Sequence, residues 1–306
     1  MTHEWSRRSL LKAGAATGIG AALGGMWSPA SAAGAQAESV DLCAVTGADA
    51  YQSTIKAIEQ LGGMGRFVPK RATVGLLINH QFRNPGAHVN PDVAAAVAAL
   101  CWEAGAKSVL SLKDERFTYW RRDGRGAEAA RRITACSGNY AAVEIPRGQA
   151  LKSVEIVTEF LTVDVLINVS VAKHHEGTNY ACTLKNTMGA LTYGTCQFFH
   201  FGHGKGGWYG DVGFLSQCVA DLNRLRKPDL AVADATTILT TNGPFGPGKL
   251  ATPHAVVAGV SAVSVDAYCT RFLNLTPAQV AMITRSAALG LGEADLGKVK
   301  SRELSI

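Results

Sequence analysis

The sequence predicts an α/β fold, with a mainly parallel sheet and helices on both of its faces. Two continuous apolar runs, ATVGLLIN at 72–79 and KSVLSL at 107–112, are typical of buried strands. Between them, PDVAAAVAALCWEAGA has the composition of a helix that begins at a proline and an aspartate and ends at a glycine. Strand, helix and strand in this order indicate a βαβ unit, in which the two strands lie parallel.

The same alternation continues to the end of the chain. We expect further strands at 140–145, 164–172, 228–235 and 254–261, and further helices at 51–63, 126–138, 211–226, 262–275 and 276–292. The helix at 211–226 is amphipathic. These segments predict a linker and one helix at 33–66, followed by a single α/β domain at 67–306. The polar, aromatic stretch at about 113–140 is a candidate for a small inserted lobe.

The first 32 residues have the pattern of a targeting segment rather than of the fold. Ser-Arg-Arg-Ser-Leu-Leu-Lys, which contains Arg7 and Arg8, resembles the twin-arginine export consensus. A weakly hydrophobic stretch and the small residues Ala30 and Ala32 follow it, as at a cleavage site. We therefore expect the twin-arginine translocation machinery as a partner and a folded mature protein in the periplasm or outside the cell. The alternatives are an ordinary secretion signal or a membrane anchor.

Composition narrows the classes of partner. With 47% hydrophobic and 18% charged residues the chain is globular, and no stretch after residue 32 is apolar enough to span a membrane. Its lysines and arginines are dispersed, which argues against nucleic acid as a partner despite a net charge of +6. The seven cysteines include no Cys-x-x-Cys, so the chain has no iron–sulfur cysteine motif. Cys101, Cys218 and Cys269 fit core positions, and a disulfide between Cys182 and Cys196 stays open.

Polar side chains gather where three of the predicted strands end. Asn79 and His80 follow the first strand, residues 173–176 follow the strand at 164–172, and Asp234 ends the strand at 228–235. In parallel sheets of this kind, ligands bind beyond the carboxyl ends of the strands. We expect these residues to converge on one rim.

The motifs on these segments are similar to those of the family called domain of unknown function 362. DVLINVSVAKHH…TLKNTMGAL resembles its INVPKLKTH…LKNLFG signature, and RKPDLAVADATTILTTNGPFGPG resembles its Pro-Asp-Leu…Gly-Asn-Gly-Pro segment. The likeness runs from about residue 72 to 292. It implies little about activity, although some members carry ferredoxin-like cysteine clusters, which suggest redox or metal chemistry there. The chain departs from the family at Asn79-His80-Gln81, where the family has Lys-Pro-Asn, and in having Ala235 after Asp234 instead of glycine.

The first candidate site lies in residues 173–186. Lys173 and Lys185 suit a carboxylate or a phosphate, and Asn186 adds a polar contact to the substrate. His174 suits proton transfer near neutral pH, because an unperturbed imidazole has a pKa near ~6.5. Adjacent histidines on extended backbone face opposite ways, so only one of His174 and His175 is expected to face the ligand. The alternative is a solvated loop.

The second candidate site is the glycine-rich segment 198–211. His200 and His203 have the spacing of two metal ligands, with Glu176, Asp211 or Asp234 as the carboxylate of a divalent metal site. In the same segment Lys205 and the surrounding glycines suit a phosphate. A flexible aromatic lid is the alternative.

Two further features carry weaker hypotheses. Asn242 and Gly243 lie in a glycine- and proline-rich stretch that is typical of a rigid turn. They are included as substrate-binding candidates, Asn242 through the family resemblance, together with Asn79 and His80, which follow the first strand. Asp266 lies in an apolar helix, where a carboxylate needs a partner; a lysine of the first site is one candidate.

These patterns favour an enzyme that binds a small anionic substrate or cofactor, with metal-assisted or redox chemistry as an extension. The rival hypothesis is a non-catalytic periplasmic binding protein or an electron-transfer accessory with a redox partner protein. A weaker alternative is a family member whose ligand site has degenerated and whose function depends only on its interactions. No Gly-x-Ser-x-Gly or His-Glu-x-x-His occurs, which argues against hydrolysis at a nucleophile elbow and against zincin proteolysis.

Overall fold

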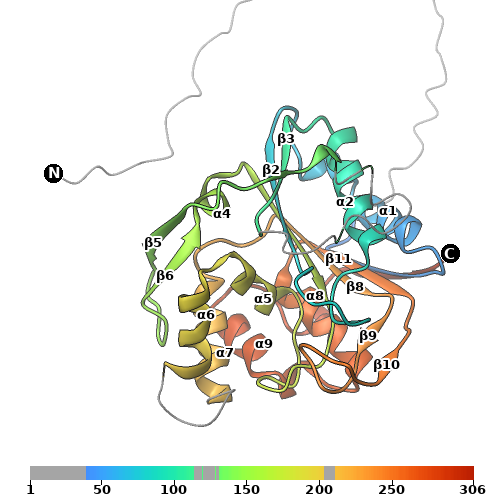
Figure 1. The fold of residues 1–306 in the computed structure, drawn as a ribbon. Helices are drawn as coiled ribbons and strands as arrows, with labels where there is room; N and C mark the ends of the chain where they lie inside the picture. The colour runs from blue at the N-terminus through green and yellow to red at the C-terminus, as the bar shows by residue number, and fades with distance from the viewer. Residues whose placement is uncertain (1–38, 114–118, 120–127, 129–130, 203–210) are drawn as a thin grey trace, which may run out of the picture. The chain divides into compact units, whose positions relative to one another are not determined.

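An eight-stranded sheet forms the centre of the computed structural model, which describes residues 39–113, 119, 128, 131–202 and 211–306 (Figure 1). The strand order is β12-β1-β11-β8-β7-β2-β3-β4, and β11 alone runs antiparallel to its neighbours in this sheet. The strands span Leu42–Thr46 (β1), Thr73–Ile78 (β2), Ser108–Ser111 (β3), Thr134–Ala135 (β4), Val165–Val171 (β7), Leu230–Ala235 (β8), Ala255–Gly259 (β11) and Ser301–Ser305 (β12). The predicted mainly parallel α/β fold is confirmed.

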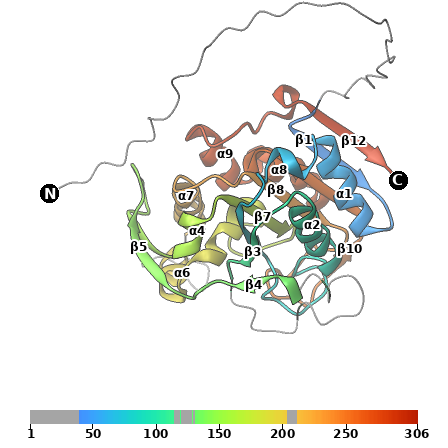
Figure 2. The same ribbon diagram turned by 90° about the horizontal axis from the view of Figure 1, so that it is seen from above.

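Helices cover both faces of this sheet. On one face α1 packs on β1 and β11, and α2 packs on α1 and β3. On the other face α5 packs on β7 and α8 packs on β8 and β11, with α7 and α9 packed against each other and against these two helices. Seen from above, α1 and α2 lie together on one side of the sheet and α7 on the other (Figure 2). The helices span Ala50–Gln60 (α1), Pro91–Glu103 (α2), Thr158–Thr162 (α4), Thr183–Asn186 (α5), Tyr193–Phe201 (α6), Val212–Leu222 (α7), Ala262–Cys269 (α8) and Ala281–Ala288 (α9). None of the described helices is long and apolar enough to cross a bilayer.

The region predicted as a linker contributes a strand to the sheet. Within 33–66 the short apolar run at 42–46 is β1, buried between β11 and β12. Residues 38–306 form one compact unit. The domain therefore begins well before residue 67, and the five residues of β1 are too few to be distinguished from a linker by their pattern.

Three other segments differ from the sequence-based expectation. Thr134 and Ala135, predicted as helix, form β4 at the sheet edge. The strand at 140–145 is β5 (Tyr140–Glu144), which pairs with β6 (Ser153–Val157) as a separate hairpin. Within the 113–140 interval, Thr134 and Ala135 thus join the main sheet and Tyr140 joins the hairpin, and most of the other residues lie outside those that the structure describes. The helix expected at 262–275 ends at Cys269, where a 3₁₀ turn at Thr270–Leu273 follows it. The helix expected at 276–292 begins later, at Ala281, because Pro277–Gln279 form a 3₁₀ turn, and it ends at Ala288.

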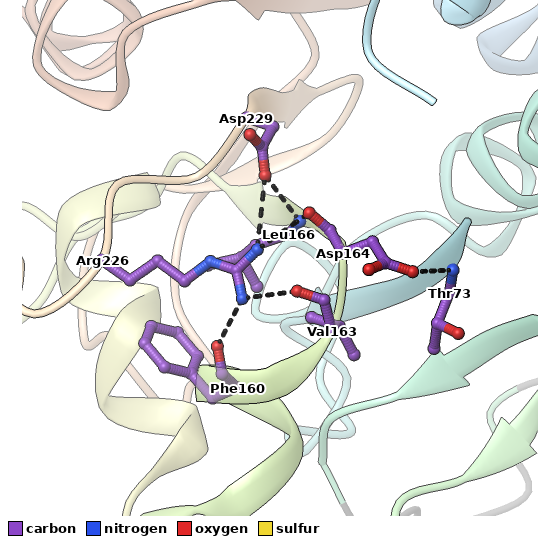
Figure 3. A network of polar contacts seen from close by, with 7 residues as sticks. All are labelled: Thr73, Phe160, Val163, Asp164, Leu166, Arg226 and Asp229. Carbon is purple, nitrogen blue, oxygen red and sulfur yellow. Dashed lines mark hydrogen bonds and ion pairs between the residues drawn. The ribbon is translucent and has the colours of Figure 1, made fainter. Parts of the chain in front are cut away.

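An arginine ties the start of β7 to the segments around it (Figure 3). The Nη1 atom of Arg226 donates to the carbonyl oxygens of Phe160 at 3.0 Å and Val163 at 2.9 Å. Its Nη2 atom lies 3.6 Å from the Asp229 carboxylate, which also accepts the Leu166 N–H at 2.8 Å. One planar guanidinium therefore satisfies carbonyl groups that α4 leaves without helical partners.

We expect Arg226→Ala to lower the free energy of unfolding by about 2–4 kcal/mol, because several partly buried acceptors lose their donor at once. Urea unfolding measures the change. The matched control is Lys298→Ala, which removes an exposed ion pair with Asp295 and should change stability by less than about 1 kcal/mol. Equal effects of the two substitutions would contradict this role for Arg226.

Candidate functional site

Three parallel strands end side by side at the predicted rim. β7 lies between β2 and β8 in the sheet, so the residues after each strand meet. The Asn79 N–H donates to the Val169 carbonyl at 3.0 Å, and the Ala172 N–H donates to the Asp234 carbonyl at 3.0 Å. The sheet therefore brings Asn79, Lys173 and Asp234 to one rim, as predicted.

Lys173 is a deeply buried charged group of this rim. Its side chain is 1% exposed. The Nζ atom donates to the Ala87 carbonyl at 2.5 Å and to Asn79 Oδ1 at 3.4 Å, and it lies 4.3 Å from the centre of the Phe82 ring. No carboxylate contacts it among the described residues. Burial, with the nearby charges of Lys113 and Lys185, lowers the pKa of Lys173 well below its usual range.

A buried carboxylate fixes the helix that carries Lys185. The Asp266 carboxylate accepts the N–H groups of Thr183 at 2.8 Å and Leu184 at 3.1 Å, the first residues of α5. These donors have no partner within the helix, and they favour a negative charge beside them. Asp266 therefore has backbone partners, and the hypothesis that a lysine pairs with it is wrong. Burial raises the pKa of Asp266 well above its usual value.

Lys185 projects from α5 toward a second lysine. Its Nζ atom contacts the Met188 Sδ atom at 3.5 Å, and the residue is partly buried. Burial, followed by the charge of Lys113, lowers the pKa of Lys185 to about 8. Lys113 follows β3 and has room because residue 189 is glycine, where a Cβ atom would lie 3.1 Å from Lys113 Nζ. Lys113 has no sequence signal of its own, since it stands at the edge of the segment predicted as an inserted lobe.

Asn186 holds the two central strands together rather than facing outward. Its buried Nδ2 group donates to the Leu77 carbonyl at 2.9 Å and to Asn168 Oδ1 at 2.7 Å, and it lies 3.3 Å from the Val169 carbonyl. These acceptors belong to β2 and β7. The position of Asn186 therefore fixes the floor beneath Lys173 and Lys185.

Of the two adjacent histidines, His175 rather than His174 faces the lysines. His175 is buried, and its ring stacks on that of His200 at 6.1 Å with an interplanar angle of 9°. Burial, then the charge of Lys185, lowers the pKa of His175 below its usual value. His174 is partly exposed, and its Nδ1 atom accepts the Gly243 N–H at 3.1 Å. The two adjacent rings face opposite ways, as predicted, but the sequence does not indicate which of them turns inward.

His80 is a buried neutral base near the same rim. Its side chain is 3% exposed, and its Nε2 atom has no hydrogen-bond partner among the described residues. The ring lies 5.4 Å from that of Tyr119. Burial and the charge of Lys113 lower the pKa of His80 to about 4. An unsatisfied buried nitrogen is costly, so this atom is a natural contact for a ligand.

The turn that contains Asn242 and Gly243 packs directly on the segment after β7. A Cβ atom at Gly243 would lie 1.8 Å from the His174 carbonyl oxygen, so only glycine fits there. The Gly243 carbonyl accepts the Glu176 N–H at 2.9 Å. Asn242 has a left-handed φ of 55° and donates to the Pro247 carbonyl at 3.2 Å, which is a turn-stabilising contact. The pair therefore shapes the wall of the rim.

The family resemblance is confirmed by comparison with known proteins. The sequence profile of the family described as domain of unknown function (DUF362) matches residues 74–271. The chain belongs to the DUF362 family. No curated protein matches it.

Two solved structures are similar to this DUF362 protein at low identity. The lactate racemase apoprotein from Thermoanaerobacterium thermosaccharolyticum is 11% identical, with 76% of this chain and 58% of that chain covered and a TM-score of 0.44. A protein from Thermotoga maritima, known from a crystal structure, is 14% identical, with 78% and 57% covered and a TM-score of 0.38. The DUF362 protein thus spans less than two thirds of the length of either.

The described members of the predicted metal set do not come together. Asp234 accepts the N–H groups of Asn90 at 2.6 Å and Thr236 at 2.8 Å, Asp211 caps α7, and Glu176 is exposed. Within the described part of the chain, no group of three or more histidine, cysteine, aspartate or glutamate side chains could hold a metal. His203 and Lys205 lie outside the described residues.

The structure adds Phe82 and Cys196 to the groups around the lysines. The Cys196 Sγ atom donates to the Met188 carbonyl at 3.3 Å, and burial raises the pKa of this thiol while Lys113 and Lys185 oppose the rise. Phe82 lies against Lys173 Nζ. Phe82 lies in the loop after β2 and has no sequence signal, and the sequence points to Cys196 only as the partner of Cys182 in a disulfide.

We expect His80 to make the DUF362 protein less stable at acid pH. The unfolded chain takes up a proton at this residue near pH 6.5, and the folded protein does so only near pH 4. Stability is therefore lost as the pH falls through this window, by about 3 kcal/mol from His80 alone. Urea unfolding of wild type and His80→Phe between pH 7 and 4 measures the difference. Parallel stability profiles would rule out a neutral buried His80.

Proposed function

We propose that this DUF362 protein binds a small anion, with a carboxylate or phosphate group, beside Lys173 and Lys185 at the carboxyl rim of the sheet. The observation that carries the proposal is electrostatic. Lys113, Lys173 and Lys185 are near enough for the charge of Lys113 to act on both of the others, and neither Lys173 nor Lys185 contacts a carboxylate among the described residues.

A bound anion would offset the cost of this arrangement. Taking ammonium groups out of water is unfavourable, and placing like charges together adds repulsion. The pKa values of Lys173 and Lys185 are lowered for both reasons. An anion between them reverses the repulsion and accepts charge-assisted hydrogen bonds. The unsatisfied Nε2 atom of His80 supports the same location.

An enzymatic role follows if a proton is exchanged with the anion. Burial and the charge of Lys185 lower the pKa of His175, so the ring is neutral and a weak base in the free protein. A bound anion would raise this pKa, and His175, whose ring stacks on that of His200, would then accept a proton from the bound molecule.

In this scheme His175 replaces His174 because it is buried next to the lysines, whereas His174 is partly exposed. The Nδ1 atom of each ring accepts a backbone N–H, from Gly177 at 3.0 Å and from Gly243 at 3.1 Å, so Nε2 of His175 would take the proton. The lysines would hold the anion, and their charge would stabilise negative charge that develops on it.

The rival function is binding without catalysis, as in a ligand-binding or electron-transfer accessory protein. The near-complete burial of Lys173 favours it, because a deeply held anion is released slowly. Incubating a stabilising anion with the protein and following its conversion by mass or NMR separates the two functions. Metal-assisted or redox chemistry would require His200 together with residues such as His203, and elemental analysis of the natively exported protein tests for it.

We further propose export through the twin-arginine pathway, on the strength of Arg7 and Arg8 and the small residues at 30–33. The protein recovered from the periplasm or medium should then begin near residue 33. Arg7→Lys with Arg8→Lys should leave the full-length chain inside the cell. Export that is unaffected by the double substitution would point to the general secretion route instead.

We expect phosphate or acetate to raise the thermal midpoint of the wild-type protein. At a concentration 100 times its dissociation constant, an anion adds about 2.7 kcal/mol of stability. Lys185→Met and Lys173→Met should each remove most of this gain, since the anion loses a partner. Differential scanning fluorimetry measures the shifts.

The matched control is Lys107→Met, which removes an exposed lysine just before β3, at the amino end of the parallel strands, and should keep the full shift. If all three variants respond like wild type, the anion binds elsewhere. If no anion of either class shifts the wild type, the proposed function is wrong.

Sulfate affinity should fall as the pH rises above about 8, the pKa of Lys185 in the free protein. Only the ammonium form binds, so affinity follows its population, which drops about tenfold between pH 7 and pH 9. Sulfate keeps its own charge over this range, and isothermal titration calorimetry follows the affinity. Lys185→Arg, which stays charged, should flatten the profile. A wild-type profile that is already flat would exclude Lys185 from the site.

A further inference from the structure

The ammonium group of Lys173 makes three contacts among the described residues, all with uncharged groups. Its Nζ atom donates to the Ala87 carbonyl at 2.5 Å and to Asn79 Oδ1 at 3.4 Å, and it lies over the Phe82 ring, 4.3 Å from the ring centre. An ammonium group has three N–H bonds, so these three neighbours match its donors in number. A ligand oxygen can therefore reach Nζ only in place of one of them.

Two of the three neighbours are held in place by their backbone. Asn79 is tied to the sheet, because its N–H donates to the Val169 carbonyl at 3.0 Å. Ala87 is fully buried and follows Gly86, where a Cβ atom would lie 2.6 Å from the Leu239 backbone nitrogen. The chain is too closely packed at this point for the Ala87 carbonyl to move aside.

Phe82 is the neighbour that can give way. It lies in the irregular loop after β2, is partly exposed and makes no hydrogen bond among the described residues. Its ring meets that of Phe245 edge-on, with 5.2 Å between the ring centres and an interplanar angle of 90°. Phe245 is 50% exposed. Two aromatic rings in contact thus lead from solvent to the buried ammonium group of Lys173.

We propose that the ring of Phe82 covers Lys173 in the free protein and that the anion displaces this ring, which rests on the proposed function. The incoming group has to bind an ammonium group more strongly than an aromatic face does. A carboxylate or phosphate oxygen meets this condition, because charge-assisted hydrogen bonds are about twice as strong as neutral ones. A neutral carbonyl or hydroxyl group gains too little to displace the ring. Phe82 is therefore a specificity-determining residue of the anion site.

The cover can be tested without any anion. Full-length protein is treated with formaldehyde and a borane reductant, which dimethylate accessible lysine amines, and is then denatured and digested with trypsin. Trypsin does not cleave after dimethyllysine, so a missed cleavage between residues 173 and 174 reports modification of Lys173. We expect Phe82→Ala to raise the rate of this modification about tenfold over wild type, because the ring contact no longer has to be broken.

The displacement is tested by the affinity for sulfate, measured by isothermal titration calorimetry. Phe82→Ala should bind sulfate about threefold to tenfold more tightly than wild type, since the anion no longer competes with a ring. Phe82→Tyr keeps an aromatic face and should restore the wild-type affinity and the wild-type rate of modification. If urea unfolding shows that Phe82→Ala is not folded, Phe82→Leu, which keeps apolar volume without an aromatic face, replaces it in this measurement.

The matched control is Phe67→Ala. Phe67 is also partly exposed beside a cation, with Arg66 Cζ 5.5 Å from its ring centre, but it precedes β2 and so lies at the opposite end of this strand from Phe82. This substitution should change neither the modification of Lys173 nor the affinity for sulfate.

The outcomes distinguish a failure of the cover from a failure of the anion site. Equal modification of Lys173 in wild type and Phe82→Ala would overturn the role of Phe82. Sulfate binding by wild type, with unchanged or weaker binding by Phe82→Ala, would overturn it as well. In both cases the proposed anion site stands. If sulfate binds neither wild type nor any Phe82 variant, the proposed function is wrong, and the displacement of Phe82 is wrong with it.

Discussion

The burial of β7 on both faces is the constraint on which the rim depends. Ile167, Val169 and Val171 pack in the core beneath α1 and α2. The residues between them point to the other face, where Asn168 donates to the Thr183 carbonyl at 3.0 Å and Ser170 lies 3.0 Å from the Thr183 hydroxyl. A buried polar group requires a partner, so these side chains hold α5 against the sheet. One strand thus positions both Lys173 at its end and Lys185 on the helix beside it.

The order and type of the central elements could be predicted because long apolar runs have few structural solutions. The runs that form β2, β7 and β8 are too continuous for a half-exposed sheet, which indicates parallel strands covered on both faces. An apolar run does not indicate whether its strand is parallel or antiparallel to its neighbours. Residues 254–261 fit both directions, and in the structure β11 is antiparallel. The edge strand β12 has an alternating exposure typical of a polar surface segment, and β1 is short, so neither has a signal of its own.

The candidate site was predictable to the extent that it depends on strand ends. Lys173, Asn79 and His80 follow strands, and the rule for ligand position in parallel sheets brings them to one rim. Contacts set by tertiary packing could not be predicted. The inward turn of His175 depends on how residues 173 and 181 pair, and the partner of Asp266 lies more than eighty residues away in sequence. Lys113 lies far from Lys173 and Lys185 in the sequence, and only the fold allows its charge to lower the pKa of both residues.

The absence of any side chain at Gly243 has a consequence for ligand size. Because this glycine lies against the His174 carbonyl, the segment after β7 and the turn at 242–246 form one closed wall. Lys113 and Lys185 are partly exposed, whereas Lys173 is 1% exposed. An anion that binds as proposed would therefore leave solvent at partly exposed lysines and reach a buried one. The group that contacts Lys173 has to be compact, because the wall formed with Gly243 leaves no room even for a Cβ atom at that position.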